Sequence, residues 1–327
     1  MGRILVTGGA GYIGSHACKA LVSAGHEPVT IDNLSVGWRD AVKFGPFEQV
    51  DLLDAEALDR VFAQYRPDAV MHFAALSDVG QSVRDPGAYW LNNVLGSLRL
   101  IEAAVRAGCL DFVFSSTCAV YGDQDGIVLD ETCALRPINA YGASKLAVEH
   151  MLRDFGAAHG MRSVAFRYFN VAGASSDGDV GEFHRPETHL IPIVLQAAAG
   201  ERASVTIHGE DYDTPDGTCV RDYVHVMDLV EAHVAGLDRL ARGGDSAVFN
   251  LGTGKGYSVR QVIDHAAAVT GRAVPVETGP RRQGDATALV SGSTRAERDL
   301  GWRPTRSNLE TMIADAWAWH RTGHYQG

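Results

Sequence analysis

The chain has 327 residues, of which 46% are hydrophobic and 21% charged, and its formal net charge is -11. This composition is ordinary for a globular protein, and the length indicates one large α/β unit or two closely joined units. The acidic balance argues against a nucleic-acid partner, and no run approaches the roughly 18 apolar residues of a membrane helix.

The cysteines also limit the possible classes of protein. The five cysteines are scattered, odd in number and without a Cys-x-x-Cys pair. This spacing argues against a zinc site or a disulfide framework and favours a reducing compartment. The first apolar run is too short for a signal peptide. We therefore expect a cytoplasmic protein with no membrane partner.

Short apolar runs alternate with segments of helical length, such as 13–24 and 143–159, through the first half of the chain. This alternation predicts an α/β fold with a doubly wound parallel sheet of the Rossmann type. The runs expected to form buried strands are Ile4–Val6, Val29–Ile31, Val70–Phe73, Phe112–Phe114 and Val164–Phe166.

The character of the chain changes after about Asn170. Residues 173–187 are rich in Gly, Ser, Asp and Glu, which predicts a surface loop, and 209–218 predict a second loop. We expect the sheet domain to comprise residues 1–170 with return segments near 220–252. Residues 171–219 and 253–327 are expected to form a smaller lobe over the carboxyl edge of the sheet, where ligands of such sheets bind.

A glycine-rich turn follows the first predicted strand and opens the first predicted helix. It fits Gly-x-Gly-x-x-Gly from Gly9 or Gly-x-x-Gly-x-x-Gly from Gly8, and both spacings let backbone N–H groups approach a pyrophosphate. The second strand ends in Asp32, where a carboxylate can bind the adenosine ribose and repel a 2′-phosphate. The pattern predicts a dinucleotide site that favours NAD over NADP; the alternative is a purely structural turn.

Tyr141 and Lys145 lie four residues apart in a predicted helix, so their side chains share one face. A phenol with a reference pKa of about 10 is a poor base at neutral pH. We expect the lysine ammonium and a positive nicotinamide ring to lower the pKa of Tyr141, so that the phenolate can take a proton from a sugar hydroxyl during hydride transfer.

Three hydroxyl residues, Ser115, Ser116 and Thr117, end the fourth predicted strand. Thr117 would hydrogen-bond the substrate and pass its proton to Tyr141, whereas the two serines are equally well explained as strand-end caps. His72 lies in an apolar run and is expected to be a core histidine. No serine-hydrolase elbow, metal-binding histidine cluster or Walker motif accompanies these residues, and we expect no metal site.

Nine motifs are long enough to compare with known families. They are TGGAGYIG (Thr7–Gly14), DNLS (Asp32–Ser35), FAAL (Phe73–Leu76), NNV (Asn92–Val94), SSTCAVYG (Ser115–Gly122), YGASK (Tyr141–Lys145), RYFN (Arg167–Asn170), DGTCVRDYVHVMDL (Asp216–Leu229) and RRQGD (Arg281–Asp285). Over essentially its whole length the chain resembles the UDP-sugar 4-epimerases of the extended short-chain dehydrogenase/reductase family. The resemblance implies reversible epimerisation at C4 of UDP-glucose and UDP-galactose through a 4-keto sugar, with bound NAD, in galactose metabolism.

The resemblance also implies a cofactor site. Tyr12 and Ile13 would contact the pyrophosphate through the backbone, and Lys145 would bind the nicotinamide ribose. The residues implied in cofactor binding are Gly8, Gly11, Tyr12, Ile13, Gly14, Asp32, Asn33, Leu34, Ser35, Gly37, Asp51, Leu52, Phe73, Ala74, Ala75, Ser77, Asn92, Ser115, Tyr141, Lys145 and Phe169.

The implied substrate site anchors UDP tightly and the sugar loosely, so that the 4-keto sugar can rotate between hydride transfers. Arg221 and Arg282 suit the diphosphate through forked hydrogen bonds, the alternative being surface ion pairs. The residues implied in substrate binding are Thr117, Tyr141, Asn170, His189, Leu190, Thr206, His208, Arg221, Arg282, Asp285 and Leu289.

Four positions depart from the pattern of the family. Ser77 stands where some epimerases carry lysine, His189 where asparagine is common, and His208 where an aromatic residue packs near uracil. Leu289 stands where some members have a tyrosine that narrows the sugar pocket. The smaller side chain predicts turnover of UDP-GlcNAc and UDP-GalNAc as well.

Other activities remain open. A sugar-nucleotide dehydratase needs an Asp-Glu pair where this chain has Cys118 and Ala119, which argues against dehydration. UDP-xylose/UDP-arabinose or UDP-glucuronate 4-epimerisation stays possible, as does a non-catalytic NAD-binding scaffold, although Tyr141 and Lys145 are both present. The family usually forms homodimers, for which the candidate helices are 93–107 and 143–159.

Overall fold

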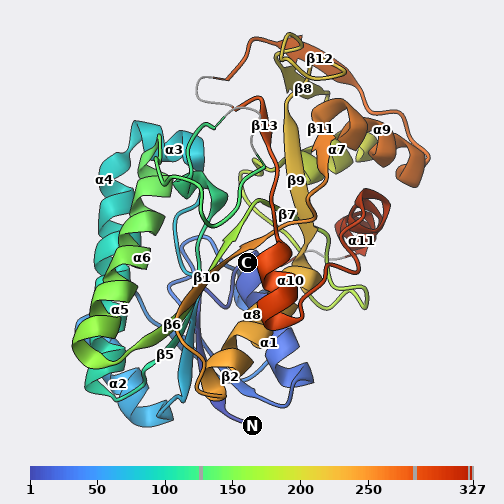
Figure 1. Cartoon of the computed structure of the whole chain (residues 1–327). Coiled ribbons are helices and arrows are strands. Elements are labelled where there is room, and N and C mark those ends of the chain that lie inside the picture. Colours follow the sequence, from blue (N-terminus) through green and yellow to red (C-terminus); the bar gives the residue numbers. More distant parts are fainter. Residues whose placement is uncertain (125–127, 283–285, 323–324, 326–327) are drawn as a thin grey trace.

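A seven-stranded parallel sheet forms the centre of the protein (Figure 1). The computed structural model describes residues 1–124, 128–282, 286–322 and 325, and within these residues the strand order is β10-β6-β5-β4-β1-β2-β3. All neighbouring strands in this sheet are parallel. The strands are β1 (Arg3–Thr7), β2 (Glu27–Asp32), β3 (Phe47–Gln49), β4 (Ala69–His72), β5 (Asp111–Ser115), β6 (Arg162–Tyr168) and β10 (Ala247–Leu251).

The five predicted strands are confirmed, although β4 ends one residue earlier than expected, at His72. The order runs outward in both directions from β1 and β4, which is the arrangement of a doubly wound Rossmann-type sheet. The predicted fold class is therefore confirmed. The sequence patterns did not predict β3 or β10, which form the two edges of the sheet.

Helices cover both faces of the sheet, because side chains of successive strand residues point to opposite sides. Ile4 and Val6 belong to one core cluster and Leu5 to the other. One face is covered by α1 (Tyr12–Ser23), α8 (Val226–Ala241) and α10 (Thr294–Leu300), and the other by α2 (Ala55–Tyr65), α5 (Gly96–Arg106) and α6 (Ala140–His159).

A smaller lobe has its own core of buried aliphatic residues and two tyrosines. Strands β11, β9 and β13 lie side by side, β7 also pairs with β9, and β12 pairs with β8. The predicted division of the chain into two domains stays a prediction; α10, from the segment assigned to the smaller lobe, packs on α8 and β10. The elements of the lobe are β7 (Asn170–Ala172), α7 (Leu190–Ala199), β8 (Val205–His208), β9 (Val220–His225), β11 (Gly256–Ser258), α9 (Val259–Thr270), β12 (Val276–Gly279), β13 (Ala288–Leu289) and α11 (Leu309–Thr322).

The predicted loops 173–187 and 209–218 contain neither helix nor strand. The first of them is not a simple surface loop, because Ala174 and Val180 are fully buried. Residues of this loop pack against Trp38, Trp319 and Tyr325. No helix in the described part of the chain is long and apolar enough to cross a membrane. The remaining short elements are η1 (Arg39–Ala41), α3 (Val79–Arg84), α4 (Pro86–Tyr89), the π-helical turn η2 (Trp90–Leu95) and η3 (Cys118–Val120).

Candidate active site

A cavity of about 650 Å³ lies at the carboxyl ends of β1, β2, β4, β5 and β6 and is lined by residues of both the sheet and the smaller lobe. This is the edge at which open α/β sheets bind their ligands. Every predicted cofactor or substrate residue that the structure describes lines this cavity, except Leu34 and Asp51. Asp285 lies outside the described residues.

The turn between β1 and α1 permits close approach of backbone groups. Gly8 has a φ of +71°, and a Cβ there would lie 2.6 Å from the backbone nitrogen of Ala74. A Cβ on Gly14 would lie 2.1 Å from the carbonyl oxygen of Gly8. Helix α1 begins at Tyr12 with Gly11 as an N-cap that has no side chain, and these residues line the cavity. Exposed N–H groups at a helix start fit a pyrophosphate.

Asp32 ends β2 at the rim of the cavity. Its carboxylate accepts hydrogen bonds from the N–H groups of Ala10 at 3.1 Å and Leu34 at 2.8 Å. Burial raises the pKa of Asp32, and these two hydrogen bonds oppose the rise. The neighbouring Asn33 donates from Nδ2 to Oδ2 of Asp51 at 2.9 Å. Leu34 and Asp51, which do not line the cavity, therefore orient the two residues that do.

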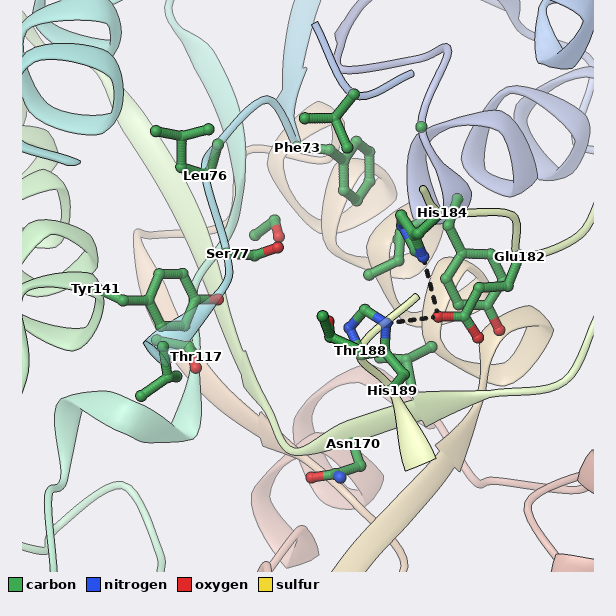
Figure 2. A pocket seen from close by; sticks show the side chains of 18 of the residues that line it. Phe73, Leu76, Ser77, Thr117, Tyr141, Asn170, Glu182, His184, Thr188 and His189 are labelled. Atoms are coloured by element: carbon green, nitrogen blue, oxygen red, sulfur yellow. Dashed lines mark ion pairs between the residues drawn. The ribbon is translucent and has the colours of Figure 1, made fainter. Parts of the chain in front are cut away.

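Helix α6 begins beside the end of β5. The side-chain oxygen of Asn139 caps this helix by accepting the N–H of Gly142 at 2.9 Å. Gly142 also allows a close contact with η3, since a Cβ there would lie 2.4 Å from the carbonyl oxygen of Ala119. Figure 2 shows the Tyr141 hydroxyl pointing into the cavity with Thr117 beside it.

The pKa of Tyr141 is raised in the protein without NAD, whereas the predicted lowering concerned the site with a positive nicotinamide ring. Burial raises it well above the ordinary value of about 10, nearby Tyr168 adds to the rise, and a hydrogen bond with Thr117 opposes it. The Nζ atom of Lys145 donates to the carbonyl oxygen of Ser115 at 2.8 Å. The groups of the protein alone therefore do not lower the pKa of Tyr141, because the cost of burying a phenolate outweighs the favourable contacts.

Lys145 is itself almost completely buried, with 3% of its surface exposed. Burial lowers its pKa to about 7, so the side chain titrates near neutral pH. The buried His72 lies close by, between the hydroxyls of Thr7 at 2.6 Å and Ser97 at 2.7 Å. The prediction that His72 is a core histidine is confirmed.

A buried ion pair holds α6 against the sheet. Glu149 accepts hydrogen bonds from Nε of Arg167 at 3.0 Å and from Nη2 at 2.5 Å, and also from Oγ of Ser116 at 2.5 Å. Arg167 donates from Nη1 to the hydroxyl of Tyr121 at 3.1 Å. The Ser116 side chain thus ties the end of β5 to α6, while the Ser115 hydroxyl contacts that of Tyr168.

The wall formed by the smaller lobe carries the other described substrate residues of the prediction, apart from Thr117 and Tyr141. Helix α7 begins there, with His189 as its N-cap. Arg221 on β9 donates from Nη1 to the carbonyl oxygens of Val220 and Ala286, both at 2.8 Å. Arg282 is exposed at the rim. The remaining residues that line this wall are Asn170 on β7, Leu190 on α7, Thr206 and His208 on β8, and Leu289 on β13.

Four side chains of the loop before α7 converge at the same wall: His189, which was predicted as a substrate residue, and Glu182, His184 and Glu187, which were not predicted from the sequence. Figure 2 shows Glu182 between His184 and His189; Glu187 completes the cluster, and the nitrogen or carboxylate atoms of the four lie within 4.8 Å of one another. Burial lowers the pKa of His184, but the two carboxylates outweigh burial and raise it to about 9. The available signal was the spacing Glu-x-His-x-x-Glu-x-His.

Aromatic residues of the cavity were missed as well. Trp38 donates from Nε1 to the carbonyl oxygen of Phe183 at 2.8 Å, and both line the cavity together with Tyr325. Tyr325 comes from the far end of the chain, and no local pattern predicts its position. These residues pack the loop 173–189 against the cofactor side of the cavity.

The fold, the glycine turn, Asp32 and the pair Tyr141 and Lys145 define a Rossmann-type, dinucleotide-dependent enzyme. The UDP-glucose 4-epimerase of Rhizobium meliloti (strain 1021) is 49% identical to this chain over 318 residues, which covers 97% of each chain. The chain belongs to the NAD dependent epimerase/dehydratase family, whose model matches residues 4–252.

Solved structures agree with this assignment. The UDP-glucose 4-epimerase from Brucella ovis in complex with NAD superposes with a TM-score of 0.95 at 46% identity, covering 97% of this chain and 98% of the other. The UDP-glucose 4-epimerase from Bifidobacterium longum in complex with NAD+ and UDP gives a TM-score of 0.93 at 36% identity, covering 98% of each.

Proposed function

We propose that the chain is an NAD-dependent UDP-sugar 4-epimerase that interconverts UDP-glucose and UDP-galactose in galactose metabolism. The observation that carries the proposal is the position of Tyr141 and Thr117, which line the same cavity as the glycine turn and Asp32. A proton acceptor and a dinucleotide cradle in one cavity suit the oxidation of a secondary alcohol. The activity of relatives that share almost the whole chain supports the same reaction.

The residues of the cavity fit NAD. The glycines of the turn leave room for a pyrophosphate, the start of α1 offers backbone N–H groups, and Asp32 presents a carboxylate to a ribose. Lys145 would hold the nicotinamide ribose. When bound, NAD would supply a positive ring and a hydride acceptor that is regenerated in each cycle.

The side chains of the protein handle the proton. Thr117 binds the C4 hydroxyl of the sugar and relays its proton to the phenolate of Tyr141. Because burial raises the pKa of Tyr141, the phenolate has little stability in the protein alone and a strong affinity for the proton once formed. When the 4-keto sugar is reduced on its other face, Tyr141 gives the proton back.

Epimerisation requires that the nucleotide stays fixed while the sugar turns. The predicted anchors on the wall of the smaller lobe, Asn170, the start of α7 at Leu190, Arg221 and Arg282, suit uracil and the diphosphate. The Bifidobacterium longum relative in complex with NAD+ and UDP supports the binding of a UDP nucleotide by this chain. Between the two sites Leu289 presents an apolar side chain, which lets a sugar rotate.

The decisive experiment measures conversion of UDP-galactose to UDP-glucose by the purified chain without added NAD. We expect turnover, NAD in the purified protein, and loss of most activity in Tyr141→Phe with NAD retained. Wild-type turnover in that variant would overturn the role of Tyr141. Parallel assays with UDP-arabinopyranose and UDP-galacturonate test the alternative epimerases, and absence of turnover with every sugar would favour a non-catalytic scaffold.

We also propose a wider choice of sugar. Leu289 lies on β13, lines the cavity and packs against the hydrophobic cluster that contains Phe169, so a larger side chain would fill part of the cavity. The space next to Leu289 suits an N-acetyl group at C2, so UDP-GlcNAc and UDP-GalNAc should also be interconverted. Failure to convert UDP-GlcNAc under conditions that convert UDP-glucose would remove this proposal.

We propose a homodimer formed through α5 and α6. The turn η2, which leads into α5, exposes two large apolar side chains, Trp90 at 45% and Leu91 at 51%. Exposed apolar side chains that lie next to each other are typical of protein–protein interfaces. Light scattering should give the mass of two chains, and Leu91→Glu should shift the protein toward monomers.

We also propose that the enzyme is cytoplasmic. The five cysteines are free thiols, which is typical of proteins in a reducing compartment.

A further inference from the structure

We propose that Glu182, His184, Glu187 and His189 form a binding site for one divalent transition-metal ion of the Zn²⁺ class. The four side chains come from one loop and bring together two imidazole nitrogens and two carboxylates. Imidazole and carboxylate ligands in a set of four are typical of protein zinc sites. The proposal departs from the expectation that the chain has no metal site.

The spacing of the four groups matches a tetrahedral ion. Bonds of about 2.0–2.2 Å to nitrogen and oxygen place neighbouring ligand atoms roughly 3.4 Å apart in a tetrahedron. The Nδ1 atom of His189 lies 3.0 Å from Oε1 of Glu182 and 2.9 Å from Oε1 of Glu187. The Nδ1 atom of His184 lies 3.4 Å and 3.5 Å from carboxylate oxygens of the same two residues. All four ligand atoms lie within 4.8 Å of one another, so one ion between them would reach each of the four.

One ligand atom is held only loosely. Nδ1 of His184 is buried and makes no hydrogen bond among the described residues, although carboxylate oxygens of Glu182 and Glu187 lie 3.4 Å and 3.5 Å away. A buried nitrogen without a hydrogen bond gains from a group that binds it more closely. The atom points toward Glu182, as Figure 2 shows, and therefore toward the centre of the proposed site.

The cluster is also held in place from outside. Glu187 accepts the N–H groups of Thr188 and His189, both at 2.8 Å, which orients its carboxylate. The carbonyl oxygen of Glu182 accepts Nε1 of Trp319 at 2.9 Å. Outer contacts of this kind fix ligand orientation in metal sites. These contacts hold the Glu187 carboxylate and the backbone of Glu182 in place within the loop.

The position of the site suggests what the ion does. Three of the ligands, Glu182, His184 and His189, line the cavity, and His189 is directly followed by the start of α7. An ion there would fix this loop and the helix start that, under the proposed function, faces the diphosphate. This consequence rests on the proposed function, whereas metal binding itself does not.

Metal binding is tested on the full-length holoenzyme after removal of any purification tag and dialysis against EDTA. Calorimetric titration with Zn²⁺ should give one site per chain. His184→Gln and Glu187→Gln should each weaken binding by at least about 100-fold, since even outer-shell changes cost 10–100-fold. His265→Gln, an exposed histidine on α9, is the matched control and should bind like the wild type.

A second measurement needs no variant. Co²⁺ bound to the wild type should give the visible spectrum of a tetrahedral nitrogen–oxygen site without a thiolate charge-transfer band, because the cluster contains no cysteine. No binding, unchanged affinity in both variants, or a thiolate band would overturn the proposal and leave two imidazolium–carboxylate ion pairs. Zinc binding by a protein without epimerase activity would contradict the proposed function and leave the metal site supported.

Discussion

The Nζ atom of Lys145 is 2.8 Å from the carbonyl oxygen of Ser115, so the lysine links the first turns of α6 to the end of β5. This contact joins the helix that carries Tyr141 to the strand that leads to Thr117. It also places an amine in surroundings where burial lowers its pKa to about 7. The contact with the carbonyl oxygen favours the charged lysine, whereas burial disfavours it, and burial prevails.

The lowered pKa of Lys145 predicts a specific dependence of stability on pH. Between about 7 and 10.5 the unfolded chain binds the proton and the folded chain releases it, so this group makes the protein more stable as pH rises through that window. Lys145→Met lacks this contribution. The free energy of unfolding of the variant, measured relative to that of the wild type, should therefore be highest near pH 7 and fall toward pH 10. Urea unfolding at several pH values measures the difference, and parallel curves would contradict the prediction.

The buried pair of Glu149 and Arg167 should contribute far more to stability than an exposed pair on the same helix. Glu149→Gln leaves the guanidinium of Arg167 buried without a counter-charge, which should lower the free energy of unfolding by about 3–5 kcal/mol. The control, Asp154→Asn, removes the partner of exposed Arg153 and should change it by less than about 1 kcal/mol. Chemical denaturation compares the two variants; equal effects would show that the buried pair has no special role.

Replacing Gly14 tests the glycine turn. A Cβ at Gly14 would lie 2.1 Å from the carbonyl oxygen of Gly8, so Gly14→Ala must move the turn. We expect bound NAD in the purified protein to fall at least about tenfold, because the turn no longer admits a pyrophosphate. Gly87→Ala is the control, since its Cβ would meet nothing closer than 3.7 Å. Normal NAD content in Gly14→Ala would show that the turn adapts.

Leu289→Tyr tests the choice of sugar. A phenol at this position of β13 would occupy space in the cavity, and turnover of the larger N-acetyl sugars should fall most. We expect kcat/KM for UDP-GalNAc to fall at least about tenfold while that for UDP-galactose changes by less than about threefold. Equal losses for both sugars would mean that the residue does not discriminate at C2.

The sequence predicted those parts of the fold that depend on a pattern within a few neighbouring residues. The buried strands and the turn at Gly8 to Gly14 follow from apolar runs and glycine spacing within a few residues. Strand β3 is short and half polar, and β10 follows a long excursion of the chain, so neither carries a clear pattern. The pairing of Tyr141 with Lys145 follows from the helical repeat alone.

Properties that depend on burial or on distant segments could not be predicted in this way. The direction of the pKa shift of Tyr141 depends on how completely the phenol is enclosed, which the repeat does not reveal. The cluster around Glu182 needs a loop folded back beneath Trp319, and Tyr325 reaches the cavity from the far end of the chain. Each of these features depends on tertiary packing, which a pattern within a short segment does not contain.

The path of the chain has a consequence for how the protein unfolds. After building β7, α7, β8 and β9 in the smaller lobe, the chain returns through α8 to lay β10 against β6. Phe249 of β10 and Ala296 of α10 are fully buried in the core shared with β1. Neither lobe can thus be cut away as a contiguous fragment without opening the interior of the other, and both should melt together in a single cooperative transition.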